Sequence, residues 1–424
     1  MLAHRLAESI FYLHSQPPLF NLYVGILLKA FPDHYASVAH ATYVVIGIIG
    51  ALALYGLLVR VGCGARLSAA IAALVTVAPA TILFENWLFY EYPVAVMLVL
   101  SGFALAGFAR KQTFWPGFAF FLLLAVVIWT RSTFHIVWML LAAGLVLVSL
   151  RNRAKVVLCA CLVPLLLVVA LYGKNLVVFG EPSTSSWFGM HWARSVFRTF
   201  PPAERAERVE RGELSRVSLV TPFSNVGDYR GIVPLSRPTG IPVLDQASSL
   251  GGRPNYNNKS YIRISNLYLH DSLRLIRGDP IAYLRGVKAS LEIFLRPGTE
   301  NPFTTRNGAK IRRYTEVFDR GIYLQTPYAA RIGWAILGSY ALALLYGVRL
   351  LLLWIRRGLS SDPALVTLLY AWLTVLNMCL ANPLTSGGEN NRIRFPVDPF
   401  VAVLVTCALV EAWPALRRRL TEGR

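Results

Sequence analysis

Residues 156–173 read VVLCACLVPLLLVVALYG, a continuous apolar stretch without a charge. A helix that crosses the roughly 30 Å hydrocarbon layer of a membrane needs about 20 such residues. The stretches are continuous rather than alternating, which predicts helices and excludes the strands of a barrel. The sequence therefore predicts an all-α integral membrane protein with about nine transmembrane helices. The other eight apolar stretches lie at 36–59, 67–84, 92–109, 114–130, 134–150, 329–355, 364–382 and 397–414.

The composition agrees with a membrane protein. Charged residues make up 15% of the chain, whereas soluble domains carry about 25%. The net charge of +20 comes without an aromatic-basic RNA motif or a helix-turn-helix pattern, so nucleic acid is excluded as a partner. Four of the five cysteines lie inside apolar stretches, which argues against disulfides and zinc.

The distribution of basic residues predicts the orientation. Short loops on the cytoplasmic side of a membrane are enriched in Lys and Arg. The loops after the first, third, fifth, seventh and ninth stretches hold 13 basic residues, and the opposite short loops hold three. The C-terminus is therefore expected in the cytoplasm of a bacterial cell, with the protein in its inner membrane. The loops at 83–91 and 383–395 then face outward.

The predicted spans divide the chain into three regions. Residues 1–180 form an N-terminal membrane region with six helices, and residues 329–424 form a C-terminal membrane region with three. Residues 181–328 form a large extracytoplasmic insert with 21 Lys and Arg against 13 Asp and Glu. Within this insert, helices are expected at 203–212, 259–277 and 280–295, since Asp279 and Pro280 suit a cap and a first helical residue.

The N-terminal region carries a shorter apolar stretch. Pro17 to Phe31 includes Asn21 and Lys29 and is too short to span, so we expect a juxtamembrane helix at the outer surface. An outer N-terminus without a signal peptide also predicts that one upstream helix is missing from the chain.

Unusual residues gather in the outer loops. Residues 84–93, FENWLFYEYP, place Glu85 and Glu91 among five aromatic residues at a membrane boundary. Ionisable groups at this depth are costly and usually face a cavity, and aromatic faces stack on sugar rings. The alternative is an interfacial aromatic belt with two solvated acids.

Arginines stand out in two further outer loops. Arg131 is the only fixed charge in a long apolar region, and Arg392 and Arg394 follow Glu389 just before the last span. These arginines oppose the orientation rule, and their paired N–H donors suit a phosphate. The alternatives are an arginine that reaches back to the interface and a polar loop that only joins two helices. No metal site is predicted, because no second His or acid stands at ligand spacing from His14.

Together these segments resemble the polytopic glycosyltransferases of fold type C, which include protein O-mannosyltransferases and aminoarabinose transferases. His14-Ser15-Gln16-Pro17-Pro18-Leu19 is similar to their H/K-P-P-L element. Residues 85–93 are similar to their acidic-aromatic loop, and Arg392-Ile393-Arg394-Phe395-Pro396 to their Arg-rich outer loop. The resemblance covers nearly the whole chain, but each motif is short.

The resemblance implies an inverting transfer of a sugar from a polyprenyl-phosphate donor to an acceptor hydroxyl. Glu85 and Glu91 are the expected catalytic residues. No cofactor is expected, and the sequence does not indicate a divalent cation. The partners implied are the lipid-linked sugar and membrane lipid. The expected substrate-binding residues are His14, Gln16, Arg131, Glu389, Arg392 and Arg394.

The chain departs from the family in its first outer loop, where the family carries its catalytic base. Only Glu8 precedes the Pro-Pro element here, and Gln16 stands where some members have Lys. Two other functions therefore stay open. A transporter or lipid flippase predicts broken helices near the middle of the membrane, often in two related halves. A non-catalytic protein of envelope assembly would keep its function after every acidic residue and arginine of the outer loops was replaced.

Overall fold

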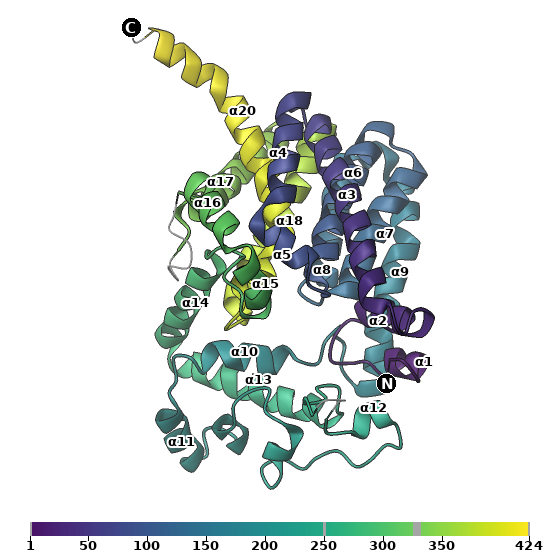
Figure 1. Cartoon of the computed structure of the whole chain (residues 1–424), viewed down its shortest axis with the longest axis vertical. Coiled ribbons are helices and arrows are strands. Elements are labelled where there is room, and N and C mark those ends of the chain that lie inside the picture. Colours follow the sequence, from purple (N-terminus) through teal and green to yellow (C-terminus); the bar gives the residue numbers. More distant parts are fainter. Residues whose placement is uncertain (1, 249–251, 325–331, 423–424) are drawn as a thin grey trace.

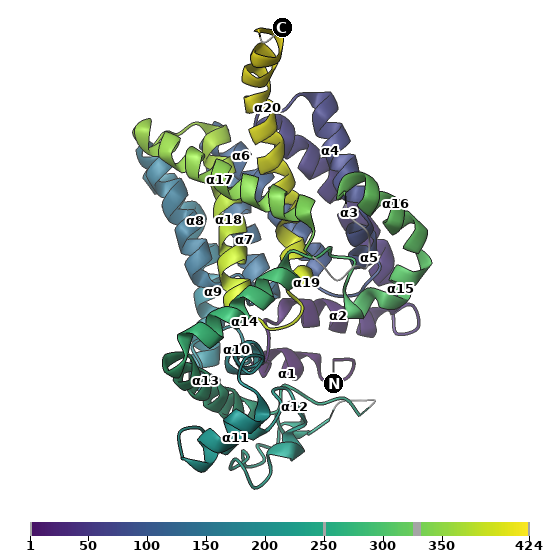
Figure 2. The same cartoon turned by 90° about the vertical axis from the view of Figure 1, so that its left-hand side faces the viewer.

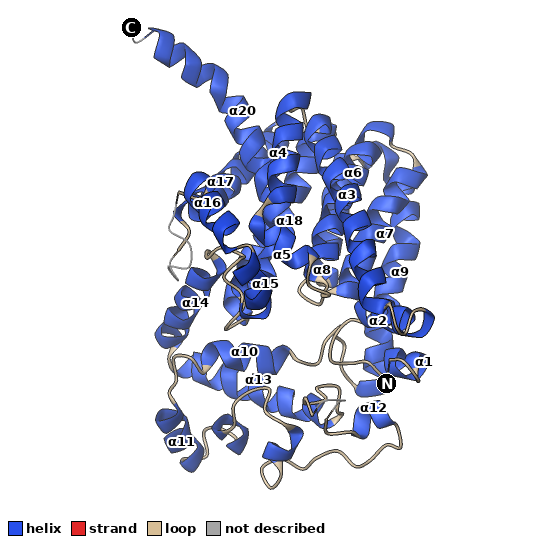
Figure 3. Ribbon diagram, in the orientation of Figure 1, coloured by secondary structure: helices blue, strands red, loops and turns tan. Residues whose placement is uncertain are grey.

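The computed structural model describes residues 2–248, 252–324 and 332–422 of the chain (Figure 1). The protein is 74% helical, and the described residues contain no strand (Figure 3). All nine apolar stretches predicted from the sequence coincide with helices in these ranges. Six described helices are long and apolar enough to cross a membrane, so the protein is a multi-pass membrane protein. They are α3 (Tyr35–Arg60), α6 (Glu91–Lys111), α9 (Ala154–Phe179), α17 (Trp334–Arg356), α18 (Pro363–Thr385) and α20 (Asp398–Glu422).

The remaining three stretches form shorter helices. The stretch at 67–84, expected to be one span, is α4 (Ala65–Val77) followed by α5 (Pro79–Glu85), and the two are bent by 57°. Pro79 explains the break, because proline lacks the N–H that would continue the helix and forces the preceding residue out of helical geometry. The other two helices are α7 (Phe114–Thr130) and α8 (Ile136–Ser149), with 17 and 14 residues.

The apolar helices pack side by side as a bundle in the upper part of the molecule (Figure 2). Its interior is largely aromatic and aliphatic, and several of the polar groups inside it find partners. The Tyr370 and Ser101 hydroxyls lie 2.7 Å apart, and the Trp138 indole N–H donates to Thr374 Oγ1 at 3.2 Å. Buried hydroxyls need such partners, because burying an unpaired one costs about 1–3 kcal/mol. Large apolar side chains such as Leu52, Trp115 and Leu345 cover the outside of the bundle, as lipid contact requires.

Most residues of the predicted insert lie beyond one end of the bundle (Figure 1). The predicted helices at 203–212, 259–277 and 280–295 are confirmed as α11, α13 and α14, whereas α10, α12, α15 and α16 were not predicted. The boundary expected at 328–329 lies outside the described residues. The helices are α10 (Phe188–Val196), α11 (Pro202–Glu210), α12 (Pro242–Asp245), α13 (Ser260–Gly278), α14 (Pro280–Phe294), α15 (Thr305–Lys310) and α16 (Arg312–Ile322).

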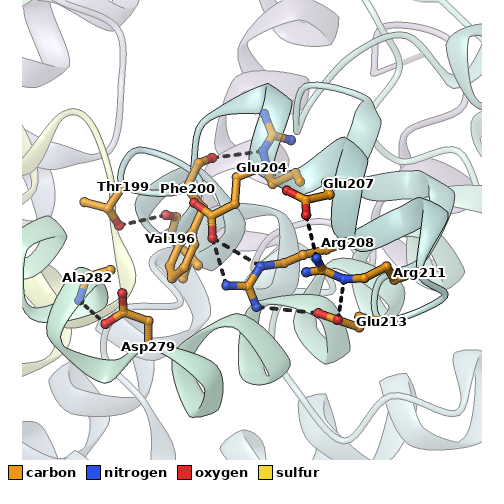
Figure 4. Close-up of polar contacts among 11 residues, drawn as sticks. Val196, Thr199, Phe200, Glu204, Glu207, Arg208, Arg211, Glu213, Asp279 and Ala282 are labelled. Carbon is orange, nitrogen blue, oxygen red and sulfur yellow. Dashed lines mark hydrogen bonds and ion pairs between the residues drawn. The ribbon is translucent and has the colours of Figure 1, made fainter.

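Local contacts explain two of these helices (Figure 4). Along α11, Arg208 contacts Glu204 at 2.8 Å and Arg211 contacts Glu207 at 2.6 Å, the spacing that supports a charged surface helix. At the start of α14, the Asp279 carboxylate accepts a hydrogen bond from the Ala282 N–H at 2.8 Å, as the sequence predicted.

The N-terminal segment contains α1 (Leu6–Phe11) and α2 (Leu19–Ala30). The helix expected between Pro17 and Phe31 is therefore present. Between α1 and α2 the chain is hydrogen-bonded to segments that are distant in the sequence. The Lys174 ammonium donates to the carbonyl oxygens of Phe11 and Leu13, at 3.1 and 2.8 Å. The Asn257 side-chain oxygen accepts from the His14 and Ser15 backbone N–H groups, at 2.9 and 3.1 Å.

Candidate functional site

Three of the segments singled out in the sequence meet at the end of the bundle that faces residues 181–324. Glu91 begins α6, Arg131 directly follows α7, and Arg392 lies in the short helix α19 (Asn390–Arg394). Glu91 Oε1 lies 3.7 Å from Arg131 Nη1 and 3.5 Å from Arg392 Nη1. The side chains of Glu91, Arg131 and Arg392 are only 1%, 4% and 11% exposed. The structure thus places one buried carboxylate between two largely buried guanidinium groups.

The hydrogen-bonding capacity of this cluster is not used up by the protein. Both Glu91 oxygens, Arg131 Nη1 and Arg392 Nε have no hydrogen-bond partner among the described residues. Most buried polar atoms do have partners, and burying an unpaired charge is costly. An incompletely satisfied buried cluster next to a cavity is typical of a ligand site.

A cavity of about 640 Å³ adjoins the cluster, within the size range of small-molecule sites. Arg131 and Arg392 both line it. Most of the other lining residues are neutral and polar, and their hydroxyl and amide groups can bond to a polyhydroxylated ligand. Glu181 is the single carboxylate among the lining residues. The wall also includes Tyr90, Ser132, Thr133, His135, residues 182–186, Phe188, Gly189, His191, Ser265, Asn266, Leu269, Ala381, Asn382, Thr385, Ser386 and Ile393.

Short backbone elements hold the two arginines. Arg131 follows the last turn of α7 with extended backbone, and its N–H still bonds the Val127 carbonyl. Helix α19 is held by amide side chains: Asn382 donates to the Asn390 carbonyl at 3.1 Å, and Asn390 donates to the Ser290 carbonyl at 2.8 Å. The arginines are therefore fixed by α7, α18 and α14 rather than by a free loop.

Aromatic rings surround the Arg392 guanidinium. Its central carbon lies 5.7, 5.3 and 5.4 Å from the ring centres of Trp87, Phe89 and Phe303. Trp87 stacks between the other two rings, at 4.6 Å from Phe89 and 5.5 Å from Phe303. Cation–π contacts of this kind stabilise a desolvated guanidinium. Two of these rings, Trp87 and Phe89, belong to the aromatic loop recognised in the sequence, and Glu389 forms an ion pair with Arg392 at 2.7 Å.

Arg394 lies on the other side of α19, away from Arg392. Its Nε is 3.1 Å from Asp398 Oδ1, and its Nη1 donates to the Phe294 carbonyl at 2.8 Å. The Tyr340 hydroxyl also donates to Asp398 Oδ1, at 2.7 Å. Arg394, Asp398 and Tyr340 line a second, mainly apolar cavity of about 250 Å³ between α4–α5, α16, α17 and α20. The two arginines expected to act together therefore line separate cavities.

Glu85 and Gln16 lie outside the larger cavity. Glu85 accepts a hydrogen bond from the Tyr92 hydroxyl at 3.3 Å and lies near Gly47 of α3. The Gln16 amide donates to the Asn21 side chain at 3.4 Å, at the start of α2. Neither residue is among those lining the 640 Å³ cavity.

His14 contacts the cavity-lining residue Ser186 and does not line the cavity itself. Its Nε2 lies 3.0 Å from the Asn257 carbonyl, which can only accept, so Nε2 carries the proton. Nδ1 then accepts from the Ser186 hydroxyl at 2.7 Å. Burial lowers the pKa of His14 to about 4, against the raising effect of the Asn257 carbonyl. A neutral His14 thus fixes the cavity-lining residue Ser186.

Several lining residues could not be identified from the sequence. His191 of α10 lines the cavity, and burial, Arg194 and Arg392 lower its pKa to about 3, so the imidazole is neutral. Glu181 is held by the Asn266 amide at 2.6 Å, across a separation of 85 residues. These residues occur as single polar positions in a polar insert, and nothing in their local sequence distinguishes them.

Within the described ranges, no group of three or more His, Cys, Asp or Glu side chains could hold a metal ion. The reactive side chains of the cavity wall are two arginines, one carboxylate, imidazoles, hydroxyls and amides. Comparison with known proteins finds no matching family, no matching curated protein and no matching solved structure.

Proposed function

We propose that the protein is a membrane glycosyltransferase that moves a sugar from a polyprenyl-phosphate donor to an acceptor hydroxyl. The observation that carries the proposal is the pair Arg131 and Arg392. Both are largely buried, both line a cavity of sugar size whose wall includes many hydroxyl and amide side chains, and both have an N–H group without a hydrogen-bond partner among the described residues.

The two guanidinium groups suit a single phosphate. Both approach the same oxygen of Glu91, so their N–H groups are close enough to bond one phosphate group. Charge-assisted bonds from arginine to phosphate are strong and directional. They strengthen further as the phosphate leaves and gains charge, which is how such donors accelerate a transfer. Glu91 then acts as a positioning residue that holds the two cations together.

The remaining lining residues supply the rest of the reaction. The acceptor hydroxyl forms a bond to the anomeric carbon, the bond from that carbon to the phosphate oxygen breaks, and the configuration inverts. Glu181 is the candidate for the base that takes the hydroxyl proton. Asn266 bonds one of its oxygens at 2.6 Å and so orients the carboxylate. Serine, threonine and asparagine side chains would bond the sugar hydroxyls.

The proposed topology has nine spans, with α4–α5, α7 and α8 each counted as one. The insert and α2 lie outside a bacterial inner membrane, and the C-terminus lies in the cytoplasm. The excess of basic residues, 13 against three in the short loops, supports this orientation. The arginine cavity then opens on the outer side, where a polyprenyl-linked donor presents its sugar. A membrane-impermeant thiol reagent should label the Arg216→Cys variant in intact cells, and not the Arg151→Cys variant.

The direct test is donor binding in nanodiscs. A polyprenyl-phosphate sugar should bind, and the same lipid without its phosphate should not. Arg392→Gln should weaken binding roughly 10- to 100-fold, since a hydrogen bond to a charged group contributes about 1.5–3 kcal/mol. Arg216→Gln, an exposed arginine of the insert, is the matched control and should bind normally. Equal binding by Arg392→Gln and Arg216→Gln would reject the assignment.

A second measurement separates binding from catalysis. Glu181→Gln should bind donor normally and lose roughly 10²- to 10⁴-fold in turnover, the usual contribution of a general base. Unchanged turnover would remove Glu181 from the mechanism and leave the phosphate site intact.

One observation favours a second function, a lipid transporter. The break between α4 and α5 lies beside the 250 Å³ apolar cavity, and broken helices line the binding sites of many transporters. In proteoliposomes, a transporter would move the lipid between leaflets without forming a glycosylated product. A glycosyltransferase would form the product without moving the lipid.

A further inference from the structure

Helix α14 has two unlike faces. Ala282, Gly286, Ser290 and Phe294 recur at every fourth position and are buried. Small residues on this face let α14 approach its neighbours closely, and a methyl group on Gly286 would lie 3.4 Å from Thr199 of the insert. The Ser290 carbonyl accepts the hydrogen bond from the Asn390 side-chain amide that holds α19 in place. This face joins α14 to the candidate site.

The opposite face of α14 is exposed and carries both large apolar and charged side chains. Ile281, Leu284 and Leu291 are 68%, 59% and 41% exposed. Arg285 and Lys288 are exposed on the same side, with Glu292 partly exposed beside them. In water such a face would be unfavourable, and exposed apolar residues flanked by cations are typical of a helix at a membrane surface.

Helix α14 is tied to two membrane-spanning helices. The Tyr283 hydroxyl donates to the Leu384 carbonyl in the last turn of α18, at 2.7 Å. The Gly333 N–H, directly before α17, donates to the Leu295 carbonyl at 3.0 Å. The helix runs obliquely from the end of α13 towards the start of α17 (Figure 2). Trp334, the first residue of α17, is also exposed, and tryptophan is enriched at membrane interfaces.

From these contacts we infer that the outer face of α14 lies in the bilayer interface and binds anionic lipid headgroups. Ile281, Leu284 and Leu291 enter the boundary between headgroups and acyl chains, and Arg285 and Lys288 bond the lipid phosphates. The two bonds to α18 and to the start of α17 fix the helix near the membrane edge, which favours lipid over a soluble protein as the occupant. This inference requires only that the bundle spans a membrane and does not depend on the glycosyltransferase proposal.

Photo-crosslinking in nanodiscs tests the contact. A photoreactive amino acid at Leu284 should form adducts with lipid, which mass spectrometry detects. The control position is Leu219, an insert leucine that is 48% exposed and lies outside α14. Leu219 should give only background adducts. Equal lipid-adduct yields at the two positions would overturn the inference. So would a result in which Leu284 crosslinks to an added soluble protein and not to lipid.

The second arm tests the charge preference. In nanodiscs that mix phosphatidylglycerol and phosphatidylcholine, adducts at Leu284 should be enriched in phosphatidylglycerol over its share of the bilayer. Arg285→Gln and Lys288→Gln should each reduce the ratio of phosphatidylglycerol to phosphatidylcholine adducts, relative to the bilayer composition, roughly fivefold at low salt. Enrichment that the double variant leaves unchanged would refute binding through these cations. Both side chains are exposed, so the variants should keep the fold, which an unchanged adduct yield in pure phosphatidylcholine verifies.

Discussion

Replacing Glu91 with glutamine tests the buried charge cluster most directly. The substitution keeps the shape of the side chain and removes the negative charge that contacts both Arg131 and Arg392, at 3.7 and 3.5 Å. At an effective dielectric constant of about 20, each contact contributes roughly 4–5 kcal/mol of Coulomb attraction. Desolvation of the charges offsets most of this. Removing one partner of a buried pair costs about 3–5 kcal/mol overall, because the other charges stay buried.

We therefore expect Glu91→Gln to lower the free energy of unfolding by about 3 kcal/mol or more. The assay is reversible unfolding in mixed micelles of a mild detergent and dodecyl sulfate, followed by far-ultraviolet circular dichroism. Arg131→Gln should be similarly destabilising alone. The double variant should lose less than the sum of the two, by roughly 0.5–3 kcal/mol, because the second change removes a charge that the first left unpaired.

Glu85→Gln is the matched control. Glu85 lies six residues earlier, near the same membrane boundary, and accepts a hydrogen bond from the Tyr92 hydroxyl at 3.3 Å. Its replacement should cost no more than about 1 kcal/mol. Equal losses for Glu91→Gln and Glu85→Gln, or strictly additive losses in the double variant, would refute the view that Glu91 holds the two arginines together.

Three further predictions concern the surroundings of the site. A Cβ on Gly189 would lie 1.8 Å from the Ser265 carbonyl oxygen, so Gly189→Ala should force α10 away from α13. The free energy of unfolding should fall by at least about 1–3 kcal/mol, the loss expected from overpacking. Gly308→Ala, whose Cβ would meet nothing within 4 Å, should leave the free energy of unfolding unchanged in the same assay. The pKa of His14 is lowered to about 4 in the folded protein, so the free energy of unfolding should be constant above pH 6.5 and fall by about 3 kcal/mol as the pH drops from 6.5 to 4. His14→Gln should flatten this pH dependence, although His191 preserves part of it. An unchanged pH profile in this variant would contradict a neutral His14. Asp279→Ala should lower the free energy of unfolding by about 1 kcal/mol, because it removes the side-chain cap of α14. Asp279→Asn should lower it much less, since asparagine also caps helices. Equal losses for the two variants would indicate that the charge of Asp279 matters rather than its capping bond.

The fold could be predicted largely because lipid imposes a simple demand. Each apolar stretch had to be helical to satisfy its backbone, and each of the nine coincides with a helix or, at 67–84, with two helices. Local chemistry also predicted α14 from Asp279 and Pro280. The bend at Pro79 was missed because the residues on either side stay apolar, so the stretch at 67–84 has no interruption in hydropathy.

The site was predictable in part. Arg131 stood out as a charge in an apolar region, and Arg392 stood out because it opposes the orientation rule; both line the cavity. Which of Arg392 and Arg394 faces that cavity could not be predicted, because both lie in one short polar segment and only its packing separates them. Glu181, Asn266 and His191 come from the insert, and only long-range folding brings them to the membrane-side arginines.

The placement of Arg392 and Arg394 on opposite sides of α19 has a consequence for sequence variation. Connecting segments usually accept insertions and deletions, and residues 386–394 have the polar composition of such a segment. One residue added inside α19 would rotate the residues after it by about 100° relative to those before it. That rotation would carry the guanidinium group of either Arg392 or Arg394 out of its cavity. The length of this segment is therefore under stricter constraint than its composition, and it should behave as a spacer of fixed register between two ligand-sized spaces.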